Sequence, residues 1–169
     1  MAGFKKILVP VEFAGGLDDD VASGNAASGI SDTTRQAVAL GAAQARQGGT
    51  LRLFHATPMI PAATTYAGPA EIPGELVGQI NAQARKAALA SLGRVVDDVC
   101  GDLEPELVAR HGDPLSLVLD EAEQWQADLI VIATSGRSRV ARFFLGSTAD
   151  RVIRGSTCPV LVVPAPRDG

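Results

Sequence analysis

Residues that build metal centres, disulfide scaffolds and nucleic-acid interfaces are scarce in this sequence. It has two cysteines and two histidines in 169 residues, and aromatic residues make up 4%. Cys100 and Cys158 have no paired spacing, so we predict two thiols in a reducing compartment rather than a disulfide or a zinc site. The formal net charge of −4 argues against a basic face, and therefore against nucleic acid as a partner.

Long apolar runs are also missing. No segment reaches the roughly 18 consecutive apolar residues that a membrane-spanning helix needs. The run ILVPV near the amino terminus is too short for a signal sequence and is interrupted by Pro10 and Glu12. We therefore expect a cytoplasmic protein without membrane contact.

What the sequence has in abundance is small and branched aliphatic side chains, within a hydrophobic content of 46%. A chain of this length and composition can bury a core without covalent cross-links. We expect a single domain over residues 1–169.

Apolar runs typical of buried strands alternate with amphipathic stretches typical of helices. The expected strands are residues 5–11, 51–56, 103–110, 127–133 and 159–163. The expected helices begin at Asp32 or Thr33, at Glu75, at Asp113-Pro114 and at Gly146. In the long second helix, the apolar residues at helical spacing are Leu76, Ile80, Ala84, Ala88 and Leu92. This alternation predicts an α/β fold, an open parallel sheet with helices on both faces.

Two stretches between these elements lack periodicity and are expected to be loops. The first is an insertion at about residues 14–31 that contains the acidic run Asp18 to Asp20, and the second covers residues 59–74. The three aspartates fit a solvated loop, with Mg²⁺ binding as the alternative.

A glycine- and hydroxyl-rich segment follows the strand that ends at Ala133. Its notable residues are Gly136, Arg137, Gly146, Ser147 and Thr148. Glycines let the backbone approach a ligand closely, and the start of a helix presents free N–H groups to an anion. The segment therefore predicts a phosphate site, although Ser147 also fits a plain helix cap that bonds the backbone at Asp150.

Other candidate residues lie at the carboxyl ends of the expected strands, where open parallel sheets bind their ligands. Glu12, Ala56 and Ala133 each end a strand, and Gly136 follows closely. His55 stands one residue before such an end, without an acid or nucleophile at motif spacing. We expect it to be packed or hydrogen-bonded rather than catalytic.

Several collinear segments resemble the universal stress protein family. They are KKILVPVEF, LRLFHATP, RHGDP, the spacing of nine residues between Gly136 and Gly146-Ser147, and STCPVLVVP. The signature of that family is Gly, two residues, Gly, nine residues, Gly, and then Ser or Thr. The resemblance implies a Rossmann-like five-stranded sheet of order 3-2-1-4-5. It also implies ATP or another adenine nucleotide across the strand ends, with Mg²⁺ as a candidate companion, and a homodimer through Pro159 to Val163.

The resemblance also implies a set of nucleotide contacts. Carried over by position, they are Pro10, Val11, Glu12, Ala56, Gly112, Ile132, Ala133, Gly136, Arg137, Gly146, Ser147 and Thr148. Two of them depart from the signature, since Ala133 replaces its first glycine and Glu12 replaces an aspartate. The methyl group of Ala133 is harmless if φ is negative and Cβ points aside, and obstructive if the backbone must come close to the ligand.

The function implied is a regulatory module in which a bound nucleotide orders the loops at 14–31, 57–74 and 134–146 and thereby alters a partner surface. No catalytic residues are expected, so any ATP hydrolysis should be slow. Two alternatives remain open: an interaction protein of the same fold that binds no nucleotide, and a weak Mg²⁺-dependent ATPase that uses the acidic loop.

Overall fold

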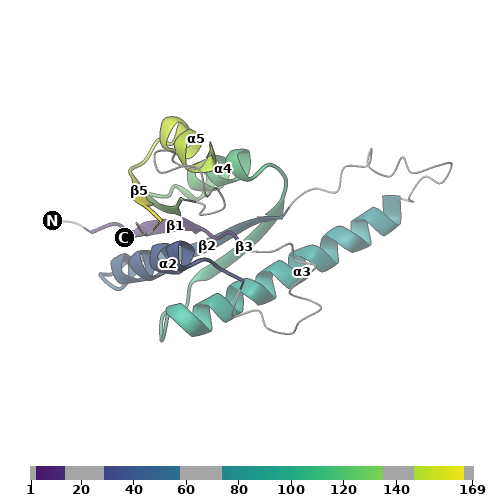
Figure 1. The fold of residues 1–169 in the computed structure, drawn as a ribbon, viewed down its shortest axis with the longest axis horizontal. Coiled ribbons are helices and arrows are strands. Elements are labelled where there is room, and N and C mark those ends of the chain that lie inside the picture. Colours follow the sequence, from purple (N-terminus) through teal and green to yellow (C-terminus); the bar gives the residue numbers. More distant parts are fainter. Residues whose placement is uncertain (1–2, 14–28, 58–73, 135–146, 166–169) are drawn as a thin grey trace.

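The computed structural model describes residues 3–13, 29–57, 74–134 and 147–165, and within these ranges a parallel sheet forms the centre of the fold (Figure 1). The strands are β1 (Lys6–Pro10), β2 (Thr50–Thr57), β3 (Glu106–His111), β4 (Leu129–Ala133) and β5 (Val160–Val163). The helices are α2 (Asp32–Ala45), α3 (Gly74–Val99), α4 (Pro114–Trp125) and α5 (Ser147–Gly155). The strand order is β3-β2-β1-β4-β5, all pairs being parallel, which confirms the expected fold class and strand order.

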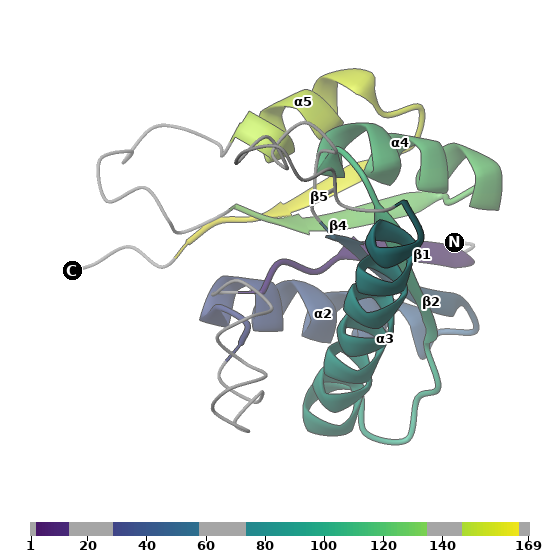
Figure 2. The ribbon, with the colours of Figure 1, turned by 90° about the vertical axis from the view of Figure 1, so that its right-hand side faces the viewer.

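Helices cover both faces of the sheet, with α2 and α3 on one side and α4 and α5 on the other (Figure 2). The core is divided accordingly, because successive residues of a strand point to opposite faces. Ile7, Val9 and Leu53 belong to the cluster on the α2 side, whereas Leu8 and Phe54 belong to the cluster on the α4 side. These five side chains are at most 1% exposed, and each contributes about 1.5–3 kcal/mol by leaving water.

The caps of two helices follow the local sequence. Asp113 caps α4, as expected, and its carboxylate accepts hydrogen bonds from the backbone N–H and the hydroxyl of Ser116. These bonds hold the pKa of Asp113 below its usual value. The cap of α2 is Ser31 rather than the expected Asp32 or Thr33. Ser31 has the extended backbone of a cap, and its hydroxyl accepts a hydrogen bond from the N–H of Thr34.

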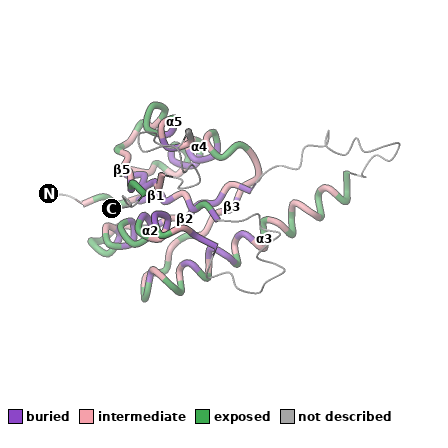
Figure 3. The backbone as a smooth tube through the Cα atoms, viewed as in Figure 1, coloured by how far each residue is buried: buried purple, intermediate pink, exposed green. Residues whose placement is uncertain are grey.

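The long helix α3 is buried only in its second half. Ala88 and Leu92 are fully covered, whereas Leu76 is 44% exposed (Figure 3). The first half extends beyond the edge of the sheet, so the regular apolar spacing has no described surface to pack on there (Figure 1). The expected helix is confirmed, and of the residues at this spacing Ala88 and Leu92 are buried whereas Leu76 is not.

Strand β3 begins later than expected, at Glu106 rather than at Leu103. Pro105 precedes it, and proline has no N–H to donate to a ladder. Leu103 instead donates its N–H to the carbonyl of Cys100 in the turn after α3.

The insertion between β1 and α2 has a defined base. Phe13 and Ile30 form an isolated antiparallel bridge, and both side chains are buried in the α2-side core. Ile30 and the capping Ser31 are therefore ordered parts of the fold, although the sequence places them in a loop. The acidic run at 18–20 and the expected loop at 59–74 lie outside the described residues, apart from Gly74, which begins α3.

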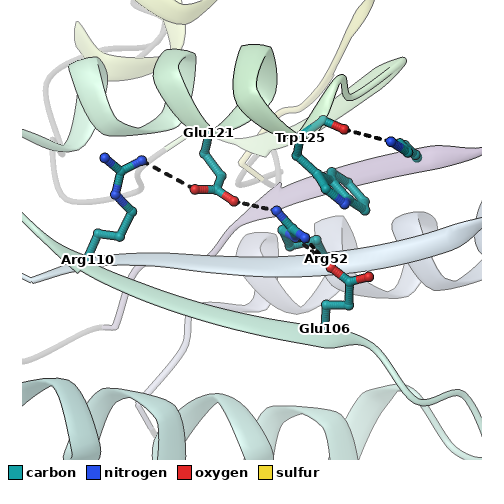
Figure 4. A network of polar contacts seen from close by, with 6 residues as sticks. Arg52, Glu106, Arg110, Glu121 and Trp125 are labelled. Atoms are coloured by element: carbon teal, nitrogen blue, oxygen red, sulfur yellow. Dashed lines mark hydrogen bonds and ion pairs between the residues drawn. The ribbon is translucent and has the colours of Figure 1, made fainter.

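A polar network joins β2 and β3 to α4 (Figure 4). Arg52 pairs with Glu106 on the neighbouring strand and with Glu121 on α4, and Arg110 reaches the second oxygen of Glu121 at 3.3 Å. The Arg52 guanidinium also lies 4.2 Å from the ring centre of Trp125. Only 8% of the Glu121 side chain is exposed, so these arginines compensate the charge of a buried carboxylate.

Both cysteines are free thiols, and burial raises the pKa of Cys100. Within the described ranges, no group of three or more histidine, cysteine or acidic side chains could hold a metal ion. No helix in the same ranges is long and apolar enough to cross a membrane.

Candidate functional site

A cleft opens at the carboxyl end of the sheet because β1 separates from β4 there. The two strands pair only through Ile7 with Leu129 and Leu8 with Ile130. The backbone N–H and carbonyl of Leu8 point toward β4. Because alternate residues of a strand point to the same neighbouring strand, the backbone nitrogen of Pro10 also points toward β4, but proline has no hydrogen to donate. The ladder therefore cannot continue past Pro10. This gap lies where the strand order reverses, which is the usual ligand site of such sheets.

The cleft is partly open, and its empty volume of about 500 Å³ includes open solvent. Its described lining residues are Pro10, Val11, Glu12, Thr34, Phe54, His55, Ala56, Pro114, Val118, Ile132, Ala133 and Thr148. They come from the ends of β1, β2 and β4 and from the first turns of three helices, so the cleft is built by elements that meet only in the folded chain.

One wall of the cleft is apolar and belongs to the core. Phe54 and Ile132 point from the sheet to the α4 side, where Val118 faces them. Phe54 is 1% exposed, Val118 3% and Ile132 4%, so this wall is held rigidly by packing. A flat apolar group such as an aromatic base fits against a wall of this kind.

The polar groups of the cleft stand around this wall. Glu12 is exposed at the end of β1, Thr34 lies in the first turn of α2, and Thr148 lies in the first turn of α5. Among the described lining residues, Glu12 and His55 are the only two with ionisable side chains. Arg137, one of the nucleotide contacts that the resemblance implies, lies outside the described residues.

His55 is packed and hydrogen-bonded, as expected from the sequence. Its Nδ1 atom lies 2.8 Å from the carbonyl oxygen of Val11, and its ring meets the Phe13 ring edge-on at 4.7 Å. Burial lowers the pKa of His55, since the charged imidazolium would lose hydration, and the hydrogen bond to Val11 opposes that effect in part. The ring is therefore neutral near pH 7.

The structure brings most of the sequence-derived candidates together. Those that line the cleft are Pro10, Val11, Glu12, Ala56, Ile132, Ala133 and Thr148. Ser147 begins α5, but its side chain lies outside the described part of the structure, as do Gly136, Arg137 and Gly146.

Gly112 is the one described candidate that does not line the cleft. It forms the turn between β3 and α4 with a φ of 146°, a conformation that favours glycine. A methyl group at this position would also come within 3.2 Å of Leu117. The turn alone therefore accounts for a glycine at position 112.

The methyl group of Ala133 points away from the apolar wall. Gln126 is the only described non-glycine residue with positive φ, so Ala133 has an ordinary extended backbone. It pairs with Val163 in the ladder and packs against the α2-side core, opposite to Ile132. Nothing in the described backbone requires the glycine that the family signature has here.

Sequence reasoning missed five lining residues: Thr34, Phe54, Pro114, Val118 and also His55, which was expected only to be packed or hydrogen-bonded. The sequence signal that could have indicated some of them is their position relative to the expected strands and helices. Thr34 and Pro114 belong to the first turns of helices that follow strands, and such turns surround the switch point of a parallel sheet. Phe54 and Val118 look like ordinary core residues, and only the three-dimensional packing shows that one side of each faces the cleft.

Comparison with known proteins gives a consistent result. The model of the universal stress protein family matches residues 3–164. A universal stress protein of Methanocaldococcus jannaschii is 34% identical over 99 residues, which is 59% of this chain and 57% of that protein. One from Thermus aquaticus is 30% identical over 136 residues, which is 79% of this chain and 91% of that protein.

Solved structures share the fold. A universal stress protein in complex with cAMP has a TM-score of 0.56 at 21% identity, with 96% of this chain and 98% of that chain covered. An Arabidopsis thaliana protein of the universal stress protein family with AMP bound has a TM-score of 0.56 at 16% identity, with 97% and 94% covered. Sequence, strand order and fold agree, and the chain belongs to the universal stress protein family.

Proposed function

We propose that this protein is a regulatory module that binds an adenine nucleotide, with ATP as the leading candidate, in the cleft between β1 and β4. The observation that carries the proposal is the combination of a rigid apolar wall with polar groups around it at the switch point of the sheet. Two proteins that share this fold have cAMP or AMP bound, which supports the choice of an adenine nucleotide.

The lining residues suit the parts of such a ligand. The base would lie against Phe54, Val118 and Ile132, beside the backbone of Ala56. Glu12, exposed at the end of β1, would accept a hydrogen bond from a ribose hydroxyl or from the base. Thr148 would place a hydroxyl near the phosphates, where the start of α5 also favours an anion.

The regulatory step would be conformational. The cleft is lined by the first turns of α2, α4 and α5 and by the ends of β1, β2 and β4, so a bound nucleotide would connect three helices and three strand ends. A ligand can bias two conformations only through different contacts in each, and these helix ends supply such contacts. The proposed ordering of loops involves mainly residues outside the described ranges, at 14–31, 57–74 and 134–146. The same is true of a role for Mg²⁺.

Thermal unfolding tests the binding proposal. With ATP, ADP, AMP or cAMP at roughly 100 times the dissociation constant, the folded state should gain about 2.7 kcal/mol, because the ligand binds only the native protein. GTP at the same concentration serves as the control for ionic effects. No shift in melting temperature with any adenine nucleotide at millimolar concentration, with and without Mg²⁺, would contradict the proposal.

We also propose that two copies associate through β5. This strand lies at one edge of the sheet, and Leu161 is 40% exposed. An apolar edge strand is normally covered by a partner or protected by charges, and Val160 to Val163 carries no charge. Light scattering at micromolar concentration should therefore give twice the chain mass of 17.4 kDa. A monomer that stays monomeric with nucleotide would refute the association.

A further inference from the structure

Two successive residues of β2 hold Val11, the first residue beyond β1. The Val11 N–H donates to the carbonyl of Phe54 at 2.8 Å, and the Val11 carbonyl lies 2.8 Å from Nδ1 of His55. A carbonyl oxygen can only accept, so Nδ1 carries the hydrogen and Nε2 of the neutral ring carries the lone pair. Both backbone groups of Val11 are thus fixed by β2.

The hydrogen bond from the imidazole of His55 replaces a backbone hydrogen bond of the β1–β2 ladder. The β1–β2 register ends at Pro10 with Phe54. In a regular parallel pair the next bond would run from the Ala56 N–H to the Val11 carbonyl, because alternate residues of a strand face the same neighbour. His55 occupies that carbonyl instead. By this alternation the backbone N–H and carbonyl of Ala56 face the β1 side, where the register has ended and no ladder bond holds them.

The imidazole ring itself is held firmly. His55 is 9% exposed, and Phe13 meets it edge-on on the α2 side of the sheet. Phe13 is in turn bridged to Ile30, which adjoins the cap of α2. The hydrogen bond to Val11 is therefore made by a ring whose position is determined on more than one side.

We propose that His55 is a positioning residue for base recognition: by bonding the Val11 carbonyl it stops the β1–β2 ladder and keeps the backbone of Ala56 open to a purine. This inference rests on the proposed nucleotide binding. The Ala56 N–H would donate to N1 of adenine, and its carbonyl would accept from the 6-amino group. Hypoxanthine presents N1–H and a 6-oxo group instead, so the same backbone edge disfavours it.

Three variants separate this role from simple packing. His55→Phe keeps the ring and its contact with Phe13 but removes the donor. His55→Asn places an amide N–H near the position of Nδ1 and should restore the bond. His111→Phe is the matched control, because His111 lies at the end of β3, bonds Thr57 and is not among the residues that line the cleft.

Calorimetric titration with AMP and IMP measures the effect, with thermal melts to confirm folding. The wild type should prefer AMP. We expect His55→Phe to bind AMP at least tenfold more weakly and to lose about tenfold of the preference for AMP over IMP, and His55→Asn to recover most of both. A loss of packing alone would weaken AMP and IMP equally. His111→Phe should match the wild type.

The outcomes distinguish the two proposals. A wild type that binds neither nucleotide overturns the proposed function and this inference with it. A wild type that prefers AMP, with the same preference in His55→Phe, overturns only the role of His55. Long-range ¹H–¹⁵N spectra of the ligand-free protein give a further reading that needs no variant to fold: Nδ1–H is expected, and an Nε2–H tautomer would refute the inference.

Discussion

Replacing Ala56 with phenylalanine is expected to lower the affinity for adenine nucleotides at least 100-fold, or about 2.7 kcal/mol. The Ala56 side chain is half-buried on the α4 side of the sheet, next to Phe54 in the cleft. A benzyl group at that position would occupy the space in which we place the base. Isothermal calorimetry with ATP and AMP measures the loss.

Val108→Phe is the control for added bulk on the same face. Val108 pairs with Phe54 across β2 and β3, is likewise partly buried in the α4-side core, and is not among the residues that line the cleft. This variant should keep its affinity within about twofold. If Ala56→Phe bound ATP as well as Val108→Phe does, the base would not lie where we place it.

The largest expected effect on stability comes from Arg52→Met, which should lower the free energy of unfolding by about 3 kcal/mol. Arg52 is 17% exposed, and its removal would leave the buried Glu121 carboxylate with the single longer contact to Arg110. Urea unfolding followed by circular dichroism is the appropriate measurement. Fluorescence is less suitable, since Arg52 lies over the ring of Trp125, the only tryptophan of the chain.

Two further variants show whether the uncompensated carboxylate is the cause. Adding Glu121→Leu to Arg52→Met should recover at least about 1 kcal/mol, because no buried charge is then left unpaired. Arg35→Met removes a pair with Asp98 in which both side chains are well exposed, and should cost less than about 1 kcal/mol. Equal costs for Arg52→Met and Arg35→Met would show that burial of Glu121 does not matter.

The sequence predicts those features that depend on neighbours along the chain. The apolar runs indicate the five strands, and Asp113-Pro114 indicates the start of α4, because strand patterns and caps are local. The first half of α3 shows the limit of this reasoning. Its spacing is that of an amphipathic helix, but whether the sheet extends far enough to cover Leu76 depends on tertiary geometry.

The candidate site was predictable to the extent that it follows the strand ends. Glu12, Ala56 and Ala133 end strands, and parallel topology brings such ends to one edge. The bond from His55 to Val11 joins residues 44 positions apart, and the bond from Arg52 to Glu121 joins residues 69 apart. Such pairs leave no periodic signal in a single sequence, so only the folded chain shows them.

The short pairing between β1 and β4 joins the part of the sheet made of β3, β2 and β1 to the part made of β4 and β5. The seam between them is secured at one end by the Asp128 carboxylate, which accepts from the backbone N–H groups of Lys5 and Lys6 at 2.8 and 3.0 Å. At the other end, beyond Pro10, the cleft takes the place of the ladder. A ligand bound there would contact strand ends on both sides of this junction, so its binding would supply the connection between β1 and β4 that the ladder does not make beyond Pro10.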